Sequence, residues 1–186
     1  MSALFLAYAT KEFSQYKSLG DKTIAQIPDE GLFWQYNPES NSIAMIVQHL
    51  SGNMLSRWSD IFSSDGEKAW RNRDREFEPV INTREELEAA WTTGWNQLFD
   101  TLQSLTADDL ERIIFIRNEP HSVMEAILRQ VGHYPSHVGQ IIYVGKMFLN
   151  SEWKSLSIPR NGSEEFNREK TASGNPGKDY VSIFKP

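Results

Sequence analysis

Residues 122–149 read SVMEAILRQVGHYPSHVGQIIYVGKMFL, and this stretch combines a helical pattern with two of the chain's four histidines. Ser122 is a residue type that commonly caps a helix N-terminus. The apolar residues after it recur at helical intervals, at Met124, Ile127, Leu128, Val131, Val138, Ile141, Ile142 and Phe148. The stretch therefore predicts one long amphipathic helix that ends near Leu149.

Three other stretches have the same periodicity. Apolar residues recur at helical spacing over 4–27, from a cap at Asn41 or Ser42 to about Ser63, and over 83–105 after a capping-box sequence. Four amphipathic helices of about twenty residues or more are typical of an antiparallel bundle. We therefore predict an all-α fold, an antiparallel four-helix bundle.

The segments between and after these helices lack such periodicity. A long charged connection is expected over 64–82, and 112–117 is a β-branched and aromatic run too short to define a sheet. A long irregular C-terminal segment divides the chain into a helical domain, 1–150, and an extension, 151–186. Scattered large side chains in the extension need cover, so we expect it to pack on the bundle or on a partner chain through Trp153, Leu156, Ile158, Phe166, Tyr180 and Phe184.

Composition excludes several classes of function. The chain has 186 residues, a formal net charge of −6 and no cysteine. The acidic balance disfavours broad electrostatic contact with nucleic acid or with an anionic membrane surface. The lack of cysteine excludes disulfides, iron–sulfur clusters and thiol nucleophiles. The N-terminal apolar run is short and no Lys or Arg precedes it, so we expect a helix there rather than a signal peptide, and a cytoplasmic protein.

Three of the four histidines form a candidate metal site. His133 and His137 are four residues apart in the last predicted helix, so both rings lie on one face. His49 lies at the margin of the apolar stripe of the second predicted helix. Three imidazoles from two facing helices would bind a divalent metal ion and leave positions open for water or substrate. The alternative is that His133 and His137 are independent surface or core residues, as we expect of His121 in a surface loop.

Helical geometry also predicts which side chains support the histidines. Gln140 projects close to the face of the histidine pair, and Asn53, Ser56 and Asp60 share the face of the histidine in the second helix. These types can partner the second ring nitrogen of a metal-bound histidine. The alternative is a solvated helix edge, which we favour for Ser56 and Asp60.

Small residues form a stripe on a neighbouring face of the last predicted helix. Gly132, Ser136 and Gly139 recur there at helical spacing. Small side chains allow two helices to approach closely, so we expect this stripe to lie at a helix–helix contact.

Four segments in this order resemble the DinB/YfiT-like superfamily, specifically a branch of unknown function: IVQHLSGNM (46–54), WRNRD (70–74), HYPSHVGQ (133–140) and LSIP (156–159). The resemblance covers most of the chain. It implies a four-helix bundle, often dimeric, in which three histidines hold a metal such as zinc or nickel, at positions that match His49, His133 and His137. Some members of the superfamily are thiol transferases that use bacillithiol, mycothiol or glutathione, and others are described as metal-dependent hydrolases.

Two functions are compatible with these features. One is a metal-dependent enzyme, a thiol S-transferase or hydrolase, in which the ion activates water or a low-molecular-weight thiol toward a small-molecule substrate. Arg129, Arg71 and Arg73 are candidate anion contacts in that enzyme, and no residue stands out as a general base. The alternative is a non-catalytic metal-binding or stress-related interaction protein that dimerises through its bundle. We expect a homodimer, and an open coordination position would favour the enzyme.

Overall fold

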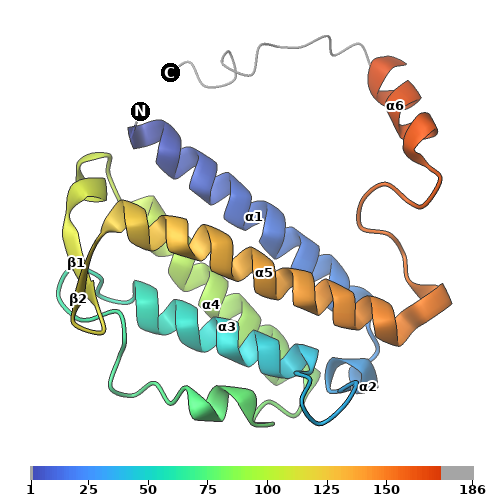
Figure 1. Ribbon diagram of the computed structural model, residues 1–186, viewed down its shortest axis with the longest axis horizontal. Helices are drawn as coiled ribbons and strands as arrows, with labels where there is room; N and C mark the ends of the chain where they lie inside the picture. Colours follow the sequence, from blue (N-terminus) through green and yellow to red (C-terminus); the bar gives the residue numbers. More distant parts are fainter. Residues whose placement is uncertain (1, 173–186) are drawn as a thin grey trace. The chain divides into compact units, whose positions relative to one another are not determined.

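Each of the four predicted helices is present (Figure 1). The computed structural model describes residues 2–172, and the chain separates into two compact units, Met1–Trp153 and Lys154–Pro186. The helices and strands of the described part are α1 Ser2–Gln26, α2 Asp29–Leu32, α3 Ile43–Trp58, α4 Arg84–Ser104, β1 Ile113–Ile116, β2 Glu119–Ser122, α5 Val123–Leu149 and α6 Ser163–Ala172, with short 3₁₀ helices at Asp74–Phe77, Asp108–Glu111 and Asn150–Glu152. The described part of the protein is therefore mostly helical.

Side-chain caps fix where the long helices begin. The Ser42 hydroxyl accepts a hydrogen bond from the Met45 backbone N–H at the start of α3. Thr83 with Glu86 and Ser122 with Glu125 each form a complete capping box at the starts of α4 and α5. These bonds satisfy N–H groups that have no partner within the helix, so the predicted helix starts are confirmed.

The end of α3 differs from the prediction. The helix ends at Trp58 rather than near Ser63. Asp60 adopts a positive φ of 49°, and its carbonyl accepts hydrogen bonds from the backbone N–H groups of Ser63 and Ser64, each at 3.0 Å. The chain therefore turns away from the helix axis, although Ile61 continues the apolar pattern and is buried.

A two-stranded sheet corrects the purely helical prediction. β1 pairs with β2 in antiparallel register, with Ile113 opposite Ser122. Arg117 and Asn118 form the turn with φ values of 57° and 60°, and the Asp65 carboxylate accepts both of their backbone N–H groups at 2.8 Å. The acid that holds the turn lies 52 residues away from Arg117, which is why local patterning did not predict a hairpin.

Four helices meet around one tyrosine. α3 packs along α4, α1 packs along α5, and α3 also packs against α5 (Figure 1). Tyr134 of α5 is fully buried, and its ring lies 5.7 Å from that of Phe13 in α1 and 6.0 Å from that of Trp95 in α4. Its hydroxyl accepts from Trp58 Nε1 and donates to Asn53 Oδ1, both at 2.9 Å and both in α3. This residue joins the apolar core to the polar face of α3.

Gly94 lies at a close contact between two helices, whereas the glycines of the small-residue stripe on α5 do not. A Cβ added to Gly94 of α4 would lie 2.9 Å from the Ser51 Cα of α3, so these two helices approach too closely for a larger residue. The stripe in α5 differs, since a Cβ on Gly132 or Gly139 would meet nothing within 4 Å. Within residues 2–172 the expected helix contact at that stripe is therefore absent.

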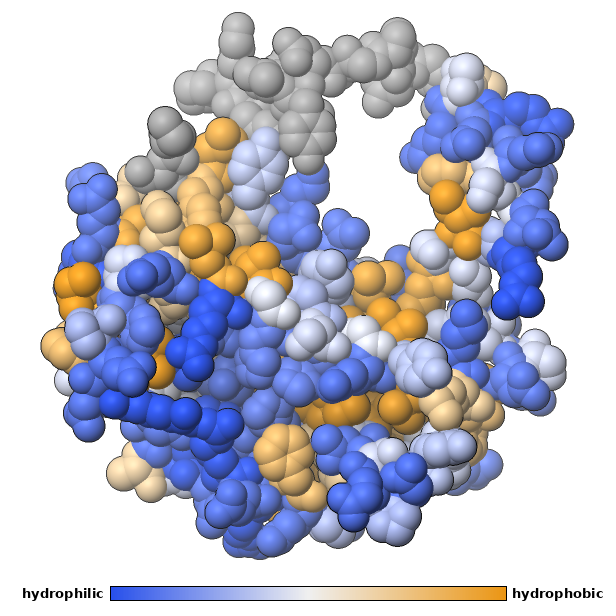
Figure 2. Space-filling model, in the orientation of Figure 1, coloured by the Kyte–Doolittle hydropathy of each residue, from blue (hydrophilic) through white to orange (hydrophobic). Residues whose placement is uncertain are grey.

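The surface is largely hydrophilic on the face shown in Figure 2, and hydrophobic residues appear there in separate groups. Exposed large apolar side chains of the first unit include Ile113 and Phe115 on the outer face of β1 and Leu128 and Tyr143 on α5. No helix within residues 2–172 is both long and apolar enough to cross a membrane.

The second unit contains α6 and the segment before it. Among the residues expected to make the extension pack, Trp153 and Leu156 are half-buried, whereas Ile158 and Phe166 are exposed. Tyr180 and Phe184 lie outside the described residues. The packing of the extension on the bundle or on a partner chain therefore stays a prediction.

Candidate metal centre

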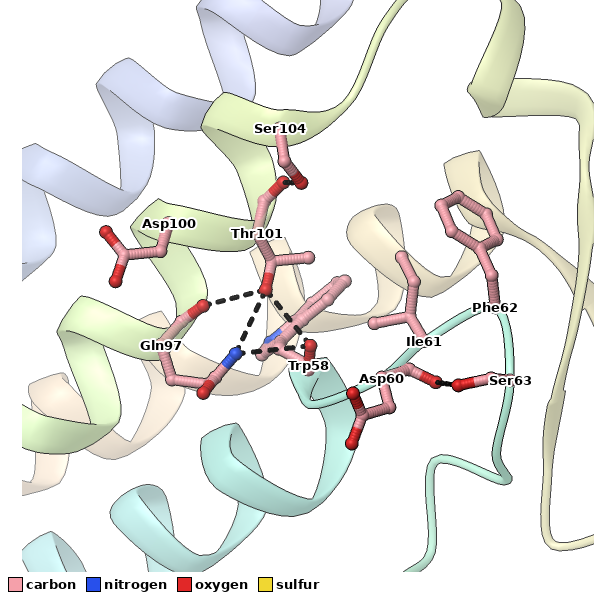
Figure 3. Close-up of a pocket in the computed structure, with 9 residues that line it drawn as sticks. All are labelled: Trp58, Asp60, Ile61, Phe62, Ser63, Gln97, Asp100, Thr101 and Ser104. Atoms are coloured by element: carbon pink, nitrogen blue, oxygen red, sulfur yellow. Dashed lines mark hydrogen bonds between the residues drawn. The ribbon is translucent and has the colours of Figure 1, made fainter.

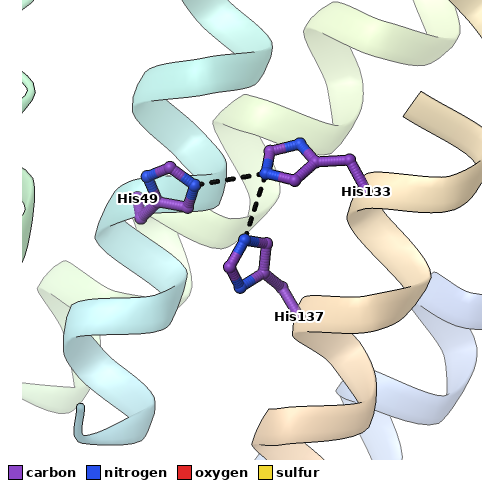
Figure 4. A group of neighbouring side chains, drawn as sticks. All are labelled: His49, His133 and His137. Carbon is purple, nitrogen blue, oxygen red and sulfur yellow. Dashed lines mark hydrogen bonds between the residues drawn. The ribbon is translucent and has the colours of Figure 1, made fainter. Parts of the chain in front are cut away.

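The three predicted histidines lie together between α3 and α5 (Figure 4). His133 Nε2 is 3.3 Å from His49 Nε2 and 3.1 Å from His137 Nε2. His49 is buried and the two histidines of α5 are half-buried. The pair on α5 converges because four residues make about one helical turn, and the third ring reaches it because α3 packs against α5.

Each ring has a side-chain oxygen at its other nitrogen. Nδ1 of His49 lies 2.8 Å from Glu76 Oε2, Nδ1 of His133 lies 2.9 Å from Gln130 Oε1, and Nδ1 of His137 lies 2.7 Å from Gln140 Oε1. These oxygens are acceptors, so each Nδ1 donates its N–H outward. In the neutral rings the three Nε2 lone pairs then face one another, an arrangement that a cation at the centre would satisfy.

Burial and neighbouring positive charges keep the rings on α5 neutral. Burial, together with the other two histidines and the charges of Arg71 and Arg129, lowers the pKa of His133 to about 4. Burial also lowers the pKa of His137, against the opposing effect of its hydrogen bond to Gln140. At neutral pH both rings are therefore in the form that binds metal.

The connection between α3 and α4 supplies the acidic partner of His49. Glu76 lies in the 3₁₀ helix Asp74–Phe77, and its carboxylate also receives Arg71 Nε at 2.6 Å and Arg71 Nη2 at 2.9 Å. Burial acts to raise the pKa of Glu76, but the hydrogen bonds from His49 and Arg71 outweigh it and hold that pKa below its ordinary value. Phe77 stacks on the His49 ring with centroids 5.1 Å apart.

The donor set fits a small divalent ion. Zn–N bonds are 2.0–2.1 Å long, so two nitrogens of a tetrahedral site lie about 3.3 Å apart. The two Nε2 separations from His133, 3.1 and 3.3 Å, match that edge, and the ligand atoms of all three rings lie within 4.8 Å of one another. Among the residues that the structure describes, this is the one group of three or more His, Cys, Asp or Glu side chains arranged to hold a metal ion. Within residues 2–172 no carboxylate belongs to the group, so the three nitrogens would supply three ligands to an ion.

Some of the predicted supporting residues do hold the histidines. Gln140 does, as its spacing from His137 indicated. Asn53, Ser56 and Asp60 do not: Asn53 accepts the Tyr134 hydroxyl, and the Ser56 hydroxyl donates to the Gly66 carbonyl. The solvated helix edge that we favoured for Ser56 and Asp60 is confirmed for the exposed Asp60 and wrong for Ser56, which is buried, and the supporting role left open for Asn53 is not observed.

Two supporting residues were missed. Gln130 lies three residues before His133 on the same helix face, so helical spacing could have identified it. Glu76 has no such signal, because it lies 27 residues from His49 in a segment without periodicity.

Asp60 instead lines a separate hollow at the ends of α3 and α4 (Figure 3). This cavity has a volume of about 410 Å³, with Trp58, Gln97, Asp100 and Thr101 also in its wall. Thr101 Oγ1 and Gln97 Nε2 both donate to the Trp58 carbonyl, at 3.0 and 3.3 Å. The Thr101 hydroxyl and the Gln97 amide in the wall of this cavity are thus already bonded to the protein, and no histidine lines the cavity.

The fold and the three-histidine group define a mostly helical protein with a centre that could hold a metal ion. The family described as "Protein of unknown function (DUF1572)" matches residues 1–162, a range that contains every long helix and all three clustered histidines. The chain belongs to this family. No curated protein matches the chain.

Proposed function

We propose that this protein is a metal-dependent enzyme of the DinB/YfiT-like superfamily, with an antiparallel four-helix bundle that holds a divalent ion through His49, His133 and His137. Zinc and nickel are the ions we favour, since neutral imidazoles suit both. The reaction we propose is transfer of a low-molecular-weight thiol to a small electrophilic substrate, or hydrolysis of such a substrate.

One observation supports this proposal above all others. The Nε2 atoms of the three rings face a common centre, and each Nδ1 atom is bonded to a side-chain oxygen that turns the ring that way. A set of histidines packed only for stability has no need for three lone pairs that face one another, because such lone pairs repel.

The ion, when bound, would supply a charge that lowers the pKa of water or of a thiol toward neutrality. The protein's own residues orient the ligands and tune that charge. Among the described residues, Glu76 is the one anion hydrogen-bonded to a ring of the group, and it acts through His49 Nδ1 while Arg71 fixes its position. Gln130 and Gln140 are neutral acceptors, so they orient rings without adding charge.

The alternative is a metal-binding interaction protein without catalysis. A structural site would close the fourth position with a further protein ligand. Glu76 is a candidate for the fourth ligand because it already bonds one of the three histidines. However, its Oε2 bonds the outer nitrogen of His49 and its Oε1 bonds Arg71, so neither oxygen faces the Nε2 atoms. The lack of a fourth protein ligand within the described residues supports the enzyme over a structural site.

Elemental analysis of protein purified without an affinity tag tests the first half of this proposal. We expect close to one zinc or nickel ion per chain, and a panel of thiol-transfer and hydrolysis assays should then show turnover that is lost with the metal. Protein that binds no divalent ion would refute the proposed centre. Stoichiometric metal with no turnover on any substrate class would favour the interaction protein.

Two further proposals concern the protein's state, and the resemblance to the superfamily supports the first of them. We propose a homodimer, which analytical ultracentrifugation tests, and a cytoplasmic location, which fractionation tests. Neither depends on the metal ion.

A further inference from the structure

Gly52 lies inside α3, three residues after His49, so the two residues share one side of the helix. A glycine inside a helix destabilises it relative to alanine, because glycine loses more backbone freedom on folding. The backbone does not require glycine here, since residue 52 has an ordinary α-helical conformation. The structural reason for a glycine at this position therefore lies in the space beside it.

The side chain of Glu76 occupies that space. A Cβ added to Gly52 would lie 2.5 Å from Glu76 Oε1 and 3.1 Å from Glu76 Cδ. Both separations are well inside the optimal contact distance of about 3.5–4.0 Å between non-bonded heavy atoms. The missing side chain thus leaves room against α3 for the carboxylate that bonds His49.

One glutamine of α3 fixes the backbone on either side of Glu76. Gln48 Nε2 donates to the carbonyls of Arg75 and Glu78, at 2.6 and 3.2 Å. Gln48 Oε1 accepts the backbone N–H of Ile81 at 3.2 Å. Because these bonds hold the segment on α3, a larger residue in place of the glycine would displace the Glu76 side chain rather than the segment.

The Glu76 carboxylate is held at both oxygens. Arg71 bonds each of them, and His49 Nδ1 bonds Oε2. Moving the carboxylate away from a methyl group on residue 52 therefore breaks bonds to Arg71, to His49 or to both. A cavity of about 290 Å³ adjoins Gly52, Arg71 and Glu76, so the displaced side chain has space to enter.

We propose that Gly52 is a positioning residue of the histidine centre, because its lack of a side chain lets Glu76 reach His49 Nδ1 and orient that ring. This inference rests on the proposed function and adds to it a residue that supplies no ligand. A methyl group at this position should leave all three histidines in place. It should remove the acceptor that turns His49 Nε2 toward His133.

Competition with a chromogenic chelator measures the zinc affinity of Gly52→Ala. We expect an affinity about 10- to 100-fold below that of the wild type, the range for losing a residue that orients a metal-binding histidine. Gly139→Ala is the matched control, since it adds the same methyl group two residues after His137 and its Cβ meets nothing within 4 Å. It should bind zinc like the wild type. Wild-type affinity in Gly52→Ala would overturn the proposal.

A second substitution separates an effect through Glu76 from a general effect on α3. The three atoms nearest to the added Cβ are Oε1, Cδ and Cγ of Glu76, and Glu76→Ala removes all of them. Adding Gly52→Ala to Glu76→Ala should therefore leave the zinc affinity unchanged, even if Gly52→Ala alone does not fold. A further tenfold loss in the double variant would show that Gly52 does not act through Glu76, and would overturn the proposal.

Nitrogen-15 NMR of the metal-free protein tests the inference without zinc. In the wild type the neutral His49 ring should carry its proton on Nδ1, where Glu76 accepts it. In Gly52→Ala the share of this tautomer should fall. A wild type that binds no zinc would refute the proposed centre, whereas an unchanged His49 tautomer in Gly52→Ala would overturn this inference alone.

Discussion

Glu76 Oε2 lies 2.8 Å from Nδ1 of His49, and the other oxygen of the same carboxylate lies 2.6 Å from Nε of Arg71. Glu76 thus joins a buried cation to one ligand of the candidate centre. The carboxylate fixes the His49 tautomer so that Nε2 faces the other rings, and its negative charge would lie one ring away from an ion held by the three histidines. Three neutral imidazoles would leave the full charge of a divalent ion in place, and the Glu76 carboxylate would offset part of that charge.

Replacing that charge should weaken metal binding without removing a ligand. Glu76→Gln keeps the shape of the side chain, and we expect metal affinity to fall about 10- to 100-fold, as for other residues that orient a metal-binding histidine. Competition with a chromogenic chelator measures the affinity. Glu78→Gln, an exposed acid of the same segment, is the control and should bind like wild type. An unchanged affinity in Glu76→Gln would mean that His49 is not a ligand.

Loss of a ligand histidine should remove metal and leave the fold. His133→Ala and His137→Ala should each abolish stoichiometric metal and turnover, while far-ultraviolet circular dichroism stays that of the wild type, because apolar burial supplies most of the stability. His121→Ala is the control, since this residue lies in β2 outside the histidine group. Contrary to the expectation of a surface loop, His121 is half-buried with its Nε2 enclosed. Unfolding of both ligand variants would indicate a structural metal.

The metal-free protein should lose stability in mild acid. The pKa of His133 is about 4 in the folded protein and 6.5 for the free side chain, so as pH falls below 6.5 the unfolded chain binds a proton first. The free energy of unfolding therefore falls between pH 6.5 and about 4, and His137 shifts it in the same direction. Urea unfolding at several pH values should show a smaller decline for His133→Gln than for wild type. Equal slopes would contradict the depressed pKa.

Tyr134→Phe should destabilise the protein by about 1–3 kcal/mol, because it leaves Trp58 Nε1 and Asn53 Oδ1 buried without their partner. Chemical denaturation measures the difference. Tyr143→Phe is the matched control, because Tyr143 lies on the same helix but is 66% exposed. Its effect should stay within about 0.5 kcal/mol.

Alanine substitutions at two glycines should change the free energy of unfolding in opposite directions. Gly94→Ala pushes a methyl group to 2.9 Å from the Ser51 Cα and should cost about 1–3 kcal/mol. Gly139→Ala meets nothing within 4 Å and should stabilise α5 by about 0.5–1 kcal/mol through helix propensity alone. Thermal unfolding of both variants checks this. A destabilised Gly139→Ala protein would indicate that this face is covered, as in the proposed homodimer.

The sequence by itself determined the long helices, their caps and the histidine pair on α5. These features depend on residues three or four positions apart, as with Ser122 and Glu125 at the start of α5, and on which face of each helix is apolar. His49 could be added because its helix was predicted to face the pair. Gln140 followed from the same local spacing.

Only the tertiary structure decided which charges surround those histidines. Glu76 and Arg71 come from a connection without periodicity, and Asp65 holds a hairpin turn 52 residues away from it. Arg57 reads in the sequence as an ordinary polar residue near a helix end, yet two of its nitrogens are enclosed with no hydrogen-bond partner among residues 2–172. The physical reason is that periodicity records which face of an element is buried, whereas ion pairs and unpaired charges depend on where distant segments come to lie.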